Sequence, residues 1–112
     1  MVDESWEDIA LMHARAGNIG DALKIYREKL NMPLVPKELL LLWGDEAMRN
    51  KKYKGAIKAY RIAQSYSRLN ELYRHLRENG FDSLAEEASA ILVTLSDFKT
   101  SEAAAVSVDM DK

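Results

Sequence analysis

Apolar residues recur along the chain at intervals of three and four residues, the spacing that places side chains on one face of an α-helix. Six segments carry this pattern, and turn-forming residues separate most of them. We therefore predict an all-α chain with helices over about residues 3–17, 20–30, 36–50, 53–66, 67–79 and 83–96.

Turn signals mark several ends of these helices. Ser5 followed by Asp8 resembles an N-capping arrangement, and Ser83 with Glu86 forms a capping box. Glycine accepts the left-handed conformation that closes a helix, so we expect helices to end at two Gly–Asn pairs. These pairs are Gly17–Asn18 and Asn79–Gly80.

Residues 41–63 combine small residues with large aromatic ones, as expected for two closely packed helices. The small residues stand where the helices approach each other, and the large residues fill the space around that contact. The small residues are Gly44, Ala56 and Ala63, and the large ones are Trp43, Tyr53 and Tyr60. In the first helix we expect a buried stripe of Trp6, Ile9, Ala10 and His13.

The chain also contains an internal repeat, in which Ala22 and Tyr26 recur as Ala56 and Tyr60. Both pairs belong to a local pattern of Ala, Leu or Ile, Lys, any residue, Tyr and Arg. A weaker third copy follows Gly80 at a shorter distance. A fixed period of this kind, about 34 residues long, is typical of stacked helical hairpins.

These residues resemble the signature of the tetratricopeptide repeat family. The second hairpin matches best, at Trp43, Gly44, Tyr53, Ala56, Tyr60 and Ala63. The first hairpin has Ala10 in place of the usual glycine, and the third is degenerate, with the bulky Tyr73 at the close-packing position. The resemblance implies antiparallel hairpins at about 3–31, 36–66 and 67–96, stacked as a short right-handed α-solenoid. We expect a domain over residues 1–97 and a flexible or disordered tail over 98–112.

Composition and the N-terminal sequence bear on the cellular compartment of the protein. The absence of cysteine excludes disulfides and thiolate metal sites and suits a reducing cytoplasm. No apolar run approaches the ~18 residues that a membrane span needs. The acidic N-terminus does not resemble a signal peptide. We expect a cytoplasmic protein without a membrane partner.

Catalytic patterns are missing from the sequence. His13 and His75 lie far apart, and no glycine-rich phosphate loop or serine nucleophile elbow is present. Adjacent acids on a helix point in different directions, so pairs such as Glu86 and Glu87 do not share a substrate. We therefore expect no catalytic residues, no metal site and no cofactor.

The resemblance implies instead a concave groove that binds a peptide or helix of a partner protein. Its first helices would line this groove with Glu4, Glu7, Leu11, Leu41, Asp45, Met48, Arg49, Asn70, Arg74 and Arg77. Leu41 and Met48 suit an apolar side chain of the partner, although they could equally pack against the fifth helix. Arg74 and Arg77 could hold an acidic residue or a terminal carboxylate, so we expect a protein partner with acidic character.

Two alternatives remain open. Residues 49–77 carry nine bases and one acid, between acidic flanks, and Lys51, Lys54, Lys58 and Arg61 could contact nucleic acid. The overall pI of about 5.7 and the lack of aromatic residues free for base stacking make nucleic acid the less favoured partner. The sixth helix ends in a stretch that is apolar almost all round, which suggests self-association through Ile91, Leu92 and Leu95.

Overall fold

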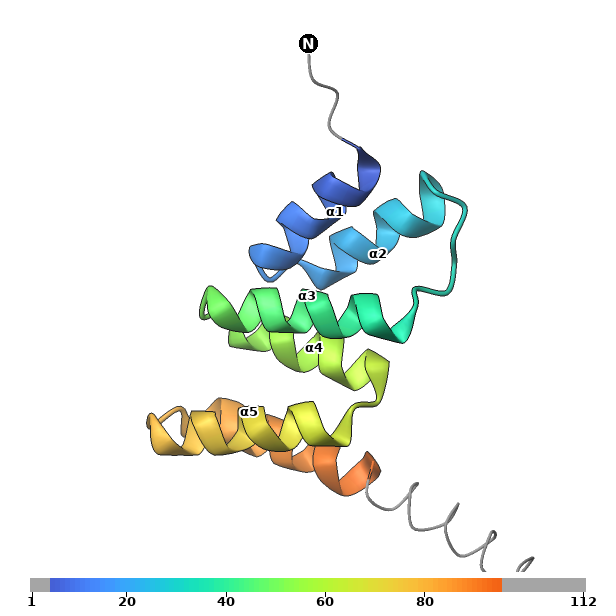
Figure 1. The fold of residues 1–112 in the computed structure, drawn as a ribbon. Helices are drawn as coiled ribbons and strands as arrows, with labels where there is room; N and C mark the ends of the chain where they lie inside the picture. The colour runs from blue at the N-terminus through green and yellow to red at the C-terminus, as the bar shows by residue number, and fades with distance from the viewer. Residues whose placement is uncertain (1–4, 96–112) are drawn as a thin grey trace, which may run out of the picture. The chain divides into compact units, whose positions relative to one another are not determined.

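A computed structural model describes residues 5–95 of the chain, and within this range it contains six helices and no strand (Figure 1). The helices are α1 (Trp6–Arg15), α2 (Ile19–Glu28), α3 (Lys37–Arg49), α4 (Tyr53–Ala63), α5 (Tyr66–Glu78) and a last helical segment over residues 82–95. The predicted all-α class is confirmed. The expected flexible tail, residues 98–112, lies outside the described residues, as does Glu4.

The helices divide into two compact units, a first unit of Met1–Ser65 and a second unit of Tyr66–Lys112. In the first unit, α1 packs against α2 and α3 packs against α4, so each pair forms a helical hairpin. α1 also contacts α3, and α2 contacts α4. Within residues 5–95, no helix is both long and apolar enough to cross a membrane.

The turns that follow α1, α3, α4 and α5 share one hydrogen-bond pattern. After α1, the N–H of Gly17 donates to the Ala14 carbonyl (2.9 Å) and that of Asn18 donates to the His13 carbonyl (2.8 Å). The same two bonds recur one repeat period later after α3, and again at a slightly shorter interval after α5. This Schellman arrangement satisfies carbonyls that the helix leaves unpaired. The turn after α4 has the same two bonds, from Gln64 to the Arg61 carbonyl and from Ser65 to the Tyr60 carbonyl. The arrangement requires a left-handed residue at its centre, and these residues are Gly17 (φ 84°), Lys51 (φ 61°), Gln64 (φ 55°) and Gly80 (φ 81°).

The core of the first unit lies between its two hairpins. It is formed by Ala10, Ala14, Ile19, Ala22, Tyr26, Leu40, Trp43, Ala59 and Ala63, all of which are buried. The Tyr26 and Trp43 rings meet edge to face, with centroids 5.4 Å apart. Small residues dominate the α1 and α2 contribution, which lets α3 insert its larger side chains against them.

Two glycines mark the closest contacts in this unit. A Cβ atom on Gly44 would overlap the Tyr60 ring, so the aromatic side chain of α4 occupies the space that α3 leaves open. A Cβ atom on Gly55 would lie 2.6 Å from the Gly17 Cα atom. The first residues of α4 therefore pack directly on the backbone of the α1–α2 turn.

The structure corrects three local predictions. α4 ends at Ala63 and not near residue 66, because Gln64 adopts a left-handed conformation (φ 55°) and closes the helix. The last helix begins at residue 82, so Ser83 lies inside its first turn and is not the N-cap. Trp6 was expected in the buried stripe of the first helix, but it is 43% exposed and the Lys29 ammonium lies 5.2 Å from its ring centroid. Ser5, by contrast, caps α1 as predicted, because its hydroxyl accepts a hydrogen bond from the Asp8 N–H.

The second unit consists of α5 and the helix over residues 82–95, joined by a short turn (Figure 1). Its buried apolar side chains are Leu69, Leu72, Leu76, Ala85, Ala88 and Leu92. Those on α5 recur at intervals of three and four residues, as the sequence predicts.

Candidate functional site

The first candidate site is the outward side of α1 and α3, two helices in contact within the first unit; we call it the α1–α3 face. Of the groove residues predicted here, Glu7 and Arg49 are exposed, whereas Leu11, Leu41, Asp45 and Met48 are half-buried. Leu11 and Leu41 also pack against the core of the unit, so only part of each side chain is accessible.

A charged network joins the ends of α1 and α3. The Glu46 carboxylate accepts hydrogen bonds from Arg15 Nε (2.7 Å) and from Arg49 Nη1 (2.5 Å). The Glu46 side chain is only 9% exposed, while both arginine side chains are largely exposed. A buried carboxylate needs such partners, because an unpaired buried charge is costly. Two cations around one anion leave this end of the face with a net positive charge and with guanidinium N–H groups directed to solvent.

Asp45 has a structural role inside the first unit. The Tyr60 hydroxyl donates a hydrogen bond to Asp45 Oδ1 at 2.5 Å, across the Gly44–Tyr60 contact. This bond fixes the Tyr60 ring against α3 and holds the Asp45 side chain. A partner that bound Asp45 would have to share this carboxylate with Tyr60.

Two apolar side chains on the α1–α3 face were not among the predicted groove residues. Met12 is 53% exposed on α1 and Leu42 is 44% exposed on α3. Each follows a buried residue of its helix by two positions, Ala10 or Leu40, and is therefore rotated by about 200° around the helix axis from that residue. Together with the accessible parts of Leu11, Leu41 and Met48, they add apolar surface to the helices that carry the Arg15–Glu46–Arg49 network.

The acidic Glu7 influences the core as well as the surface. Burial raises the pKa of the Tyr26 hydroxyl above its ordinary value, and the negative charge of Glu7 raises it further. On the same two helices, His13 Nδ1 lies 4.0 Å from the Asp21 carboxylate, on a partly exposed surface. Within residues 5–95, no three His, Cys, Asp or Glu side chains are grouped so that they could hold a metal ion.

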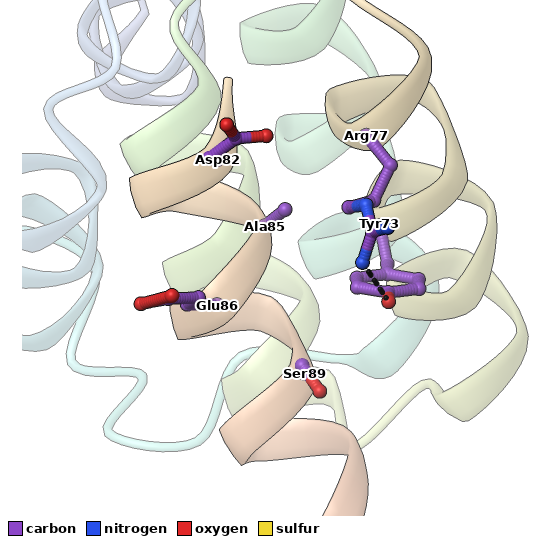
Figure 2. Close-up of a pocket in the computed structure, with 6 residues that line it drawn as sticks. All are labelled: Tyr73, Arg77, Asp82, Ala85, Glu86 and Ser89. Carbon is purple, nitrogen blue, oxygen red and sulfur yellow. Dashed lines mark hydrogen bonds between the residues drawn. The ribbon is translucent and has the colours of Figure 1, made fainter. Parts of the chain in front are cut away.

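A second candidate site is a pocket of about 350 Å³ in the second unit (Figure 2). It is lined by Tyr73 and Arg77 from α5 and by Asp82, Ala85, Glu86 and Ser89 from the last helix. The Arg77 guanidinium lies 5.8 Å from the Tyr73 ring centroid and donates a hydrogen bond to the Tyr73 hydroxyl at 3.0 Å. Figure 2 shows Ala85 and Ser89 on the side of their helix that faces Tyr73, whereas the Glu86 side chain extends to the other side.

The remaining predicted groove residues lie on α5. Asn70 is half-buried, and Arg74 and Arg77 are exposed. The structure therefore brings Glu7, Leu11, Leu41, Asp45, Met48 and Arg49 together within the first unit, while Asn70, Arg74 and Arg77 belong to the second. Arg77, which was expected to hold a partner's carboxylate, is folded onto Tyr73.

The candidate oligomer surface on the last helix is smaller than the sequence indicated. Leu92 is buried and is not available at the surface. Ile91 and Leu95 are half-buried, and Val93 between them is the exposed apolar side chain of this stretch.

The basic residues of α4 form a continuous exposed row. Lys54, Lys58 and Arg61 all project away from the buried stripe of α4, which contains no acidic residue. The Lys58 side chain extends over α2. A Cβ atom added to Gly20 would lie 3.2 Å from Lys58 Nζ.

Sequence reasoning missed Arg15, Met12 and Leu42 as surface residues of the α1–α3 face. A signal for Arg15 was present, because Arg15 and Arg49 are separated by the same interval as the repeated Ala and Tyr pairs. The shared partner Glu46 could not be inferred, since a contact between α1 and α3 depends on the packing of two hairpins.

In comparisons with protein-family models, with curated proteins and with solved structures, no match to the chain was found.

Proposed function

We propose that this chain is a non-catalytic protein-recognition module that binds a peptide or helix of a partner protein on the α1–α3 face. The observation that carries the proposal is the composition of this face. Met12 of α1 and Leu42 of α3 are exposed apolar side chains, and Glu46 joins the two helices through Arg15 and Arg49, whose side chains are largely exposed. Apolar side chains beside charge-assisted donors are the features with which helical surfaces bind peptides.

The partner that fits this face carries an apolar side chain followed by a carboxylate. The apolar group would bury Met12 and Leu42, and methionine adapts its shape to such a contact. The carboxylate would accept hydrogen bonds from the guanidinium groups that Glu46 leaves partly free, which is the geometry arginine favours.

Assignment to the tetratricopeptide-like class, with hairpins stacked as a short right-handed solenoid, is part of the same proposal. Its support is the pairing of α1 with α2 and of α3 with α4, the 34-residue interval between the turns inside these two hairpins, and the Tyr60 ring packed over Gly44. Repeats of this kind present successive first helices as a recognition surface.

The test is a comparison of two double variants in affinity capture from nuclease-treated cell lysate. Met12→Glu with Leu42→Glu places two charges on the α1–α3 face without touching a buried residue. Met32→Glu with Leu34→Glu is the matched control, because both residues are also exposed apolar side chains, in the α2–α3 loop. We expect a discrete protein to be retained by the parent chain and by the control, and to be lost by the face variant. Identical protein sets from all three would contradict the proposal.

A further inference from the structure

The six residues that line the pocket of the second unit occupy the same positions, relative to their turn, as six residues of the first hairpin. The Schellman turn aligns the two hairpins, because the bonds of Gly17 and Asn18 after α1 match those of Gly80 and Phe81 after α5. The alignment places Ala10, Ala14, Ile19, Ala22, Leu23 and Tyr26 on Tyr73, Arg77, Asp82, Ala85, Glu86 and Ser89, in that order.

In the first hairpin these positions form a surface that receives a helix. Five of them are buried in the core of the first unit, and Leu23 packs against that core. Leu40 and Trp43 of α3 belong to the same cluster, so α3 covers this surface. The equivalent surface of the second unit, which we call the end face, therefore occupies the position that receives a helix in the first hairpin.

The end face differs from its counterpart in chemistry. It is polar and open, and it surrounds the pocket of about 350 Å³ shown in Figure 2. Its one cation, Arg77, already bonds to Tyr73. Asp82 and Glu86 are exposed and have no hydrogen-bond or ion-pair partner among residues 5–95. The helix that this face accepts must therefore supply positive charge and not a large apolar side chain.

The spacing of the two carboxylates defines the complementary helix. Asp82 and Glu86 are four residues apart on one helix, so a partner helix would meet them with two cations that are also four residues apart. α4 has this arrangement in Lys54 and Lys58, both of which are exposed. It contains no acid that would oppose docking, and within residues 5–95 neither lysine has an ion-pair partner.

We propose that the end face of one chain docks α4 of a second copy of the same chain, with Lys54 and Lys58 paired to Asp82 and Glu86. The two surfaces are different, so the contact is head-to-tail and each added copy leaves one free surface at either end. The area involved is that of two helix faces, which places the contact among weak and transient ones. Exposed ion pairs are screened by salt, so association must weaken as ionic strength rises.

The experiment is sedimentation velocity on the purified, nuclease-treated full chain, from about 10 μM to about 1 mM, at low and high salt. We expect the average mass at low salt to rise steadily with concentration, without a plateau at the dimer. At high salt the same samples should be monomeric. A chain that remains monomeric up to the highest concentration at low salt would overturn the proposal. Nuclease treatment ensures that nucleic acid does not bridge the basic rows and imitate self-association.

Two neutralised variants identify the surfaces. The end-face variant is Asp82→Asn with Glu86→Gln, and the α4 variant is Lys54→Gln with Lys58→Gln. Each alone should associate about tenfold more weakly than the parent, because each loses two exposed ion pairs. Mixed together they should form a 1:1 complex and nothing larger, because only one intact α4 and one intact end face remain per pair. Formation of this complex also shows that both variants are folded.

The control variant is Glu71→Gln with Glu87→Gln, which removes the same charge from exposed positions of the second unit that do not line the pocket. It should associate like the parent chain. Association that survives unchanged in the end-face variant would show that Asp82 and Glu86 do not form the contact. Association that is lost equally in the control would show that net charge drives it. Either result would make the proposal wrong.

Discussion

Close packing in the first unit depends on two residues that lack a side chain, Gly44 and Gly55. At Gly44 the missing Cβ atom is replaced by the Tyr60 ring, and at Gly55 by the backbone of Gly17. These contacts position the Tyr60 hydroxyl on Asp45 and bring the α1–α2 turn against α4. The α1–α3 face is thus supported from behind by residues that never reach the surface.

A pair of glycine substitutions tests this support. Gly44→Ala should lower the free energy of unfolding by about 1–3 kcal/mol, because the added methyl group displaces the Tyr60 ring. Gly20→Ala is the matched control, since its new Cβ atom would meet only the flexible end of Lys58. There the gain in helix propensity should stabilise the chain by up to about 1 kcal/mol. Urea unfolding measures both effects, and equal shifts in one direction would contradict the described contact.

Tyr26 gives a prediction for alkaline pH. Its pKa is raised above the ordinary value of 10.0 by burial and by Glu7. The folded chain therefore keeps this proton at pH values where the unfolded chain has lost it. Below about pH 10 the group contributes no pH dependence, and above it stability should fall with rising pH, by up to about 1.4 kcal/mol per unit between the two pKa values.

The comparison is between the parent chain and Tyr26→Phe, because other tyrosines and lysines also titrate in this range. The stability difference between the two proteins, from urea unfolding, should be constant from pH 7 to about pH 9. It should then shift in favour of Tyr26→Phe as the pH rises further. A difference that stays constant up to pH 11 would show that the Tyr26 pKa is the same in both states.

At the scale of elements, the Schellman turns after α1, α3, α4 and α5 use the same geometry with different residues. Gly17 and Gly80 adopt positive φ without strain, whereas Lys51 adopts φ 61° with a Cβ atom present. Left-handed backbone costs an ordinary residue about 1–2 kcal/mol. The turn after α3, like the turn after α4 with Gln64 at φ 55°, therefore has a cost that the two glycine turns avoid.

Lys51→Gly should relieve this cost and stabilise the chain by about 1 kcal/mol, since glycine is the preferred residue of this motif. Gly80→Ala should destabilise it by about 1–2 kcal/mol. A Cβ atom on Gly80 would meet nothing within 4 Å, so that change isolates the backbone conformation from packing. Thermal unfolding of both variants provides the measurement. A neutral Gly80→Ala would mean that the turn after α5 is not held in the left-handed conformation.

These turns explain why the sequence predicted the helices well. Gly17 and Gly80 end helices through local backbone preferences, which a reader of the sequence can recognise. The end of α4 was missed because its left-handed residue is Gln64, and glutamine carries no such signal. At Ser83 the sequence signal is present but the cap is not. Ser83 and Glu86 have the spacing of a capping box, yet the helix begins at residue 82.

The candidate site was predicted less completely than the helices. Periodicity places Leu41, Met48 and Arg49 on α3, but the bond from Arg15 to Glu46 spans 31 residues and depends on how α1 packs against α3. Arg77 appeared free in the sequence because its partner Tyr73 had been considered only as a core residue. The Tyr73–Arg77 pair is separated by four residues on one helix and is therefore a local contact, whereas the Arg15–Glu46 pair is decided by tertiary packing.

At the scale of the whole molecule, the two units differ in the charge of the surfaces they offer. The first unit carries the basic row of α4, and the second carries the unpaired acids of the end face. Neither surface shares a residue with the α1–α3 face, so partner recognition and self-association could proceed together. Loss of self-association in the end-face variant, with partner capture unchanged, would separate the two activities.

The division into units also predicts that residues 1–65 fold without the rest of the chain. Their core cluster is formed entirely by residues between Ala10 and Ala63. A chain of this size buries only about 60% of its unfolded surface, so its stability should amount to a few kcal/mol at most. We expect a helical circular-dichroism spectrum and a single reversible thermal transition below that of the full chain. Gly44→Ala in this fragment should lower the transition temperature as it does in the full chain, because Tyr60 and Asp45 lie within the fragment. A fragment without a cooperative transition would show that the core of the first unit requires the second unit to form.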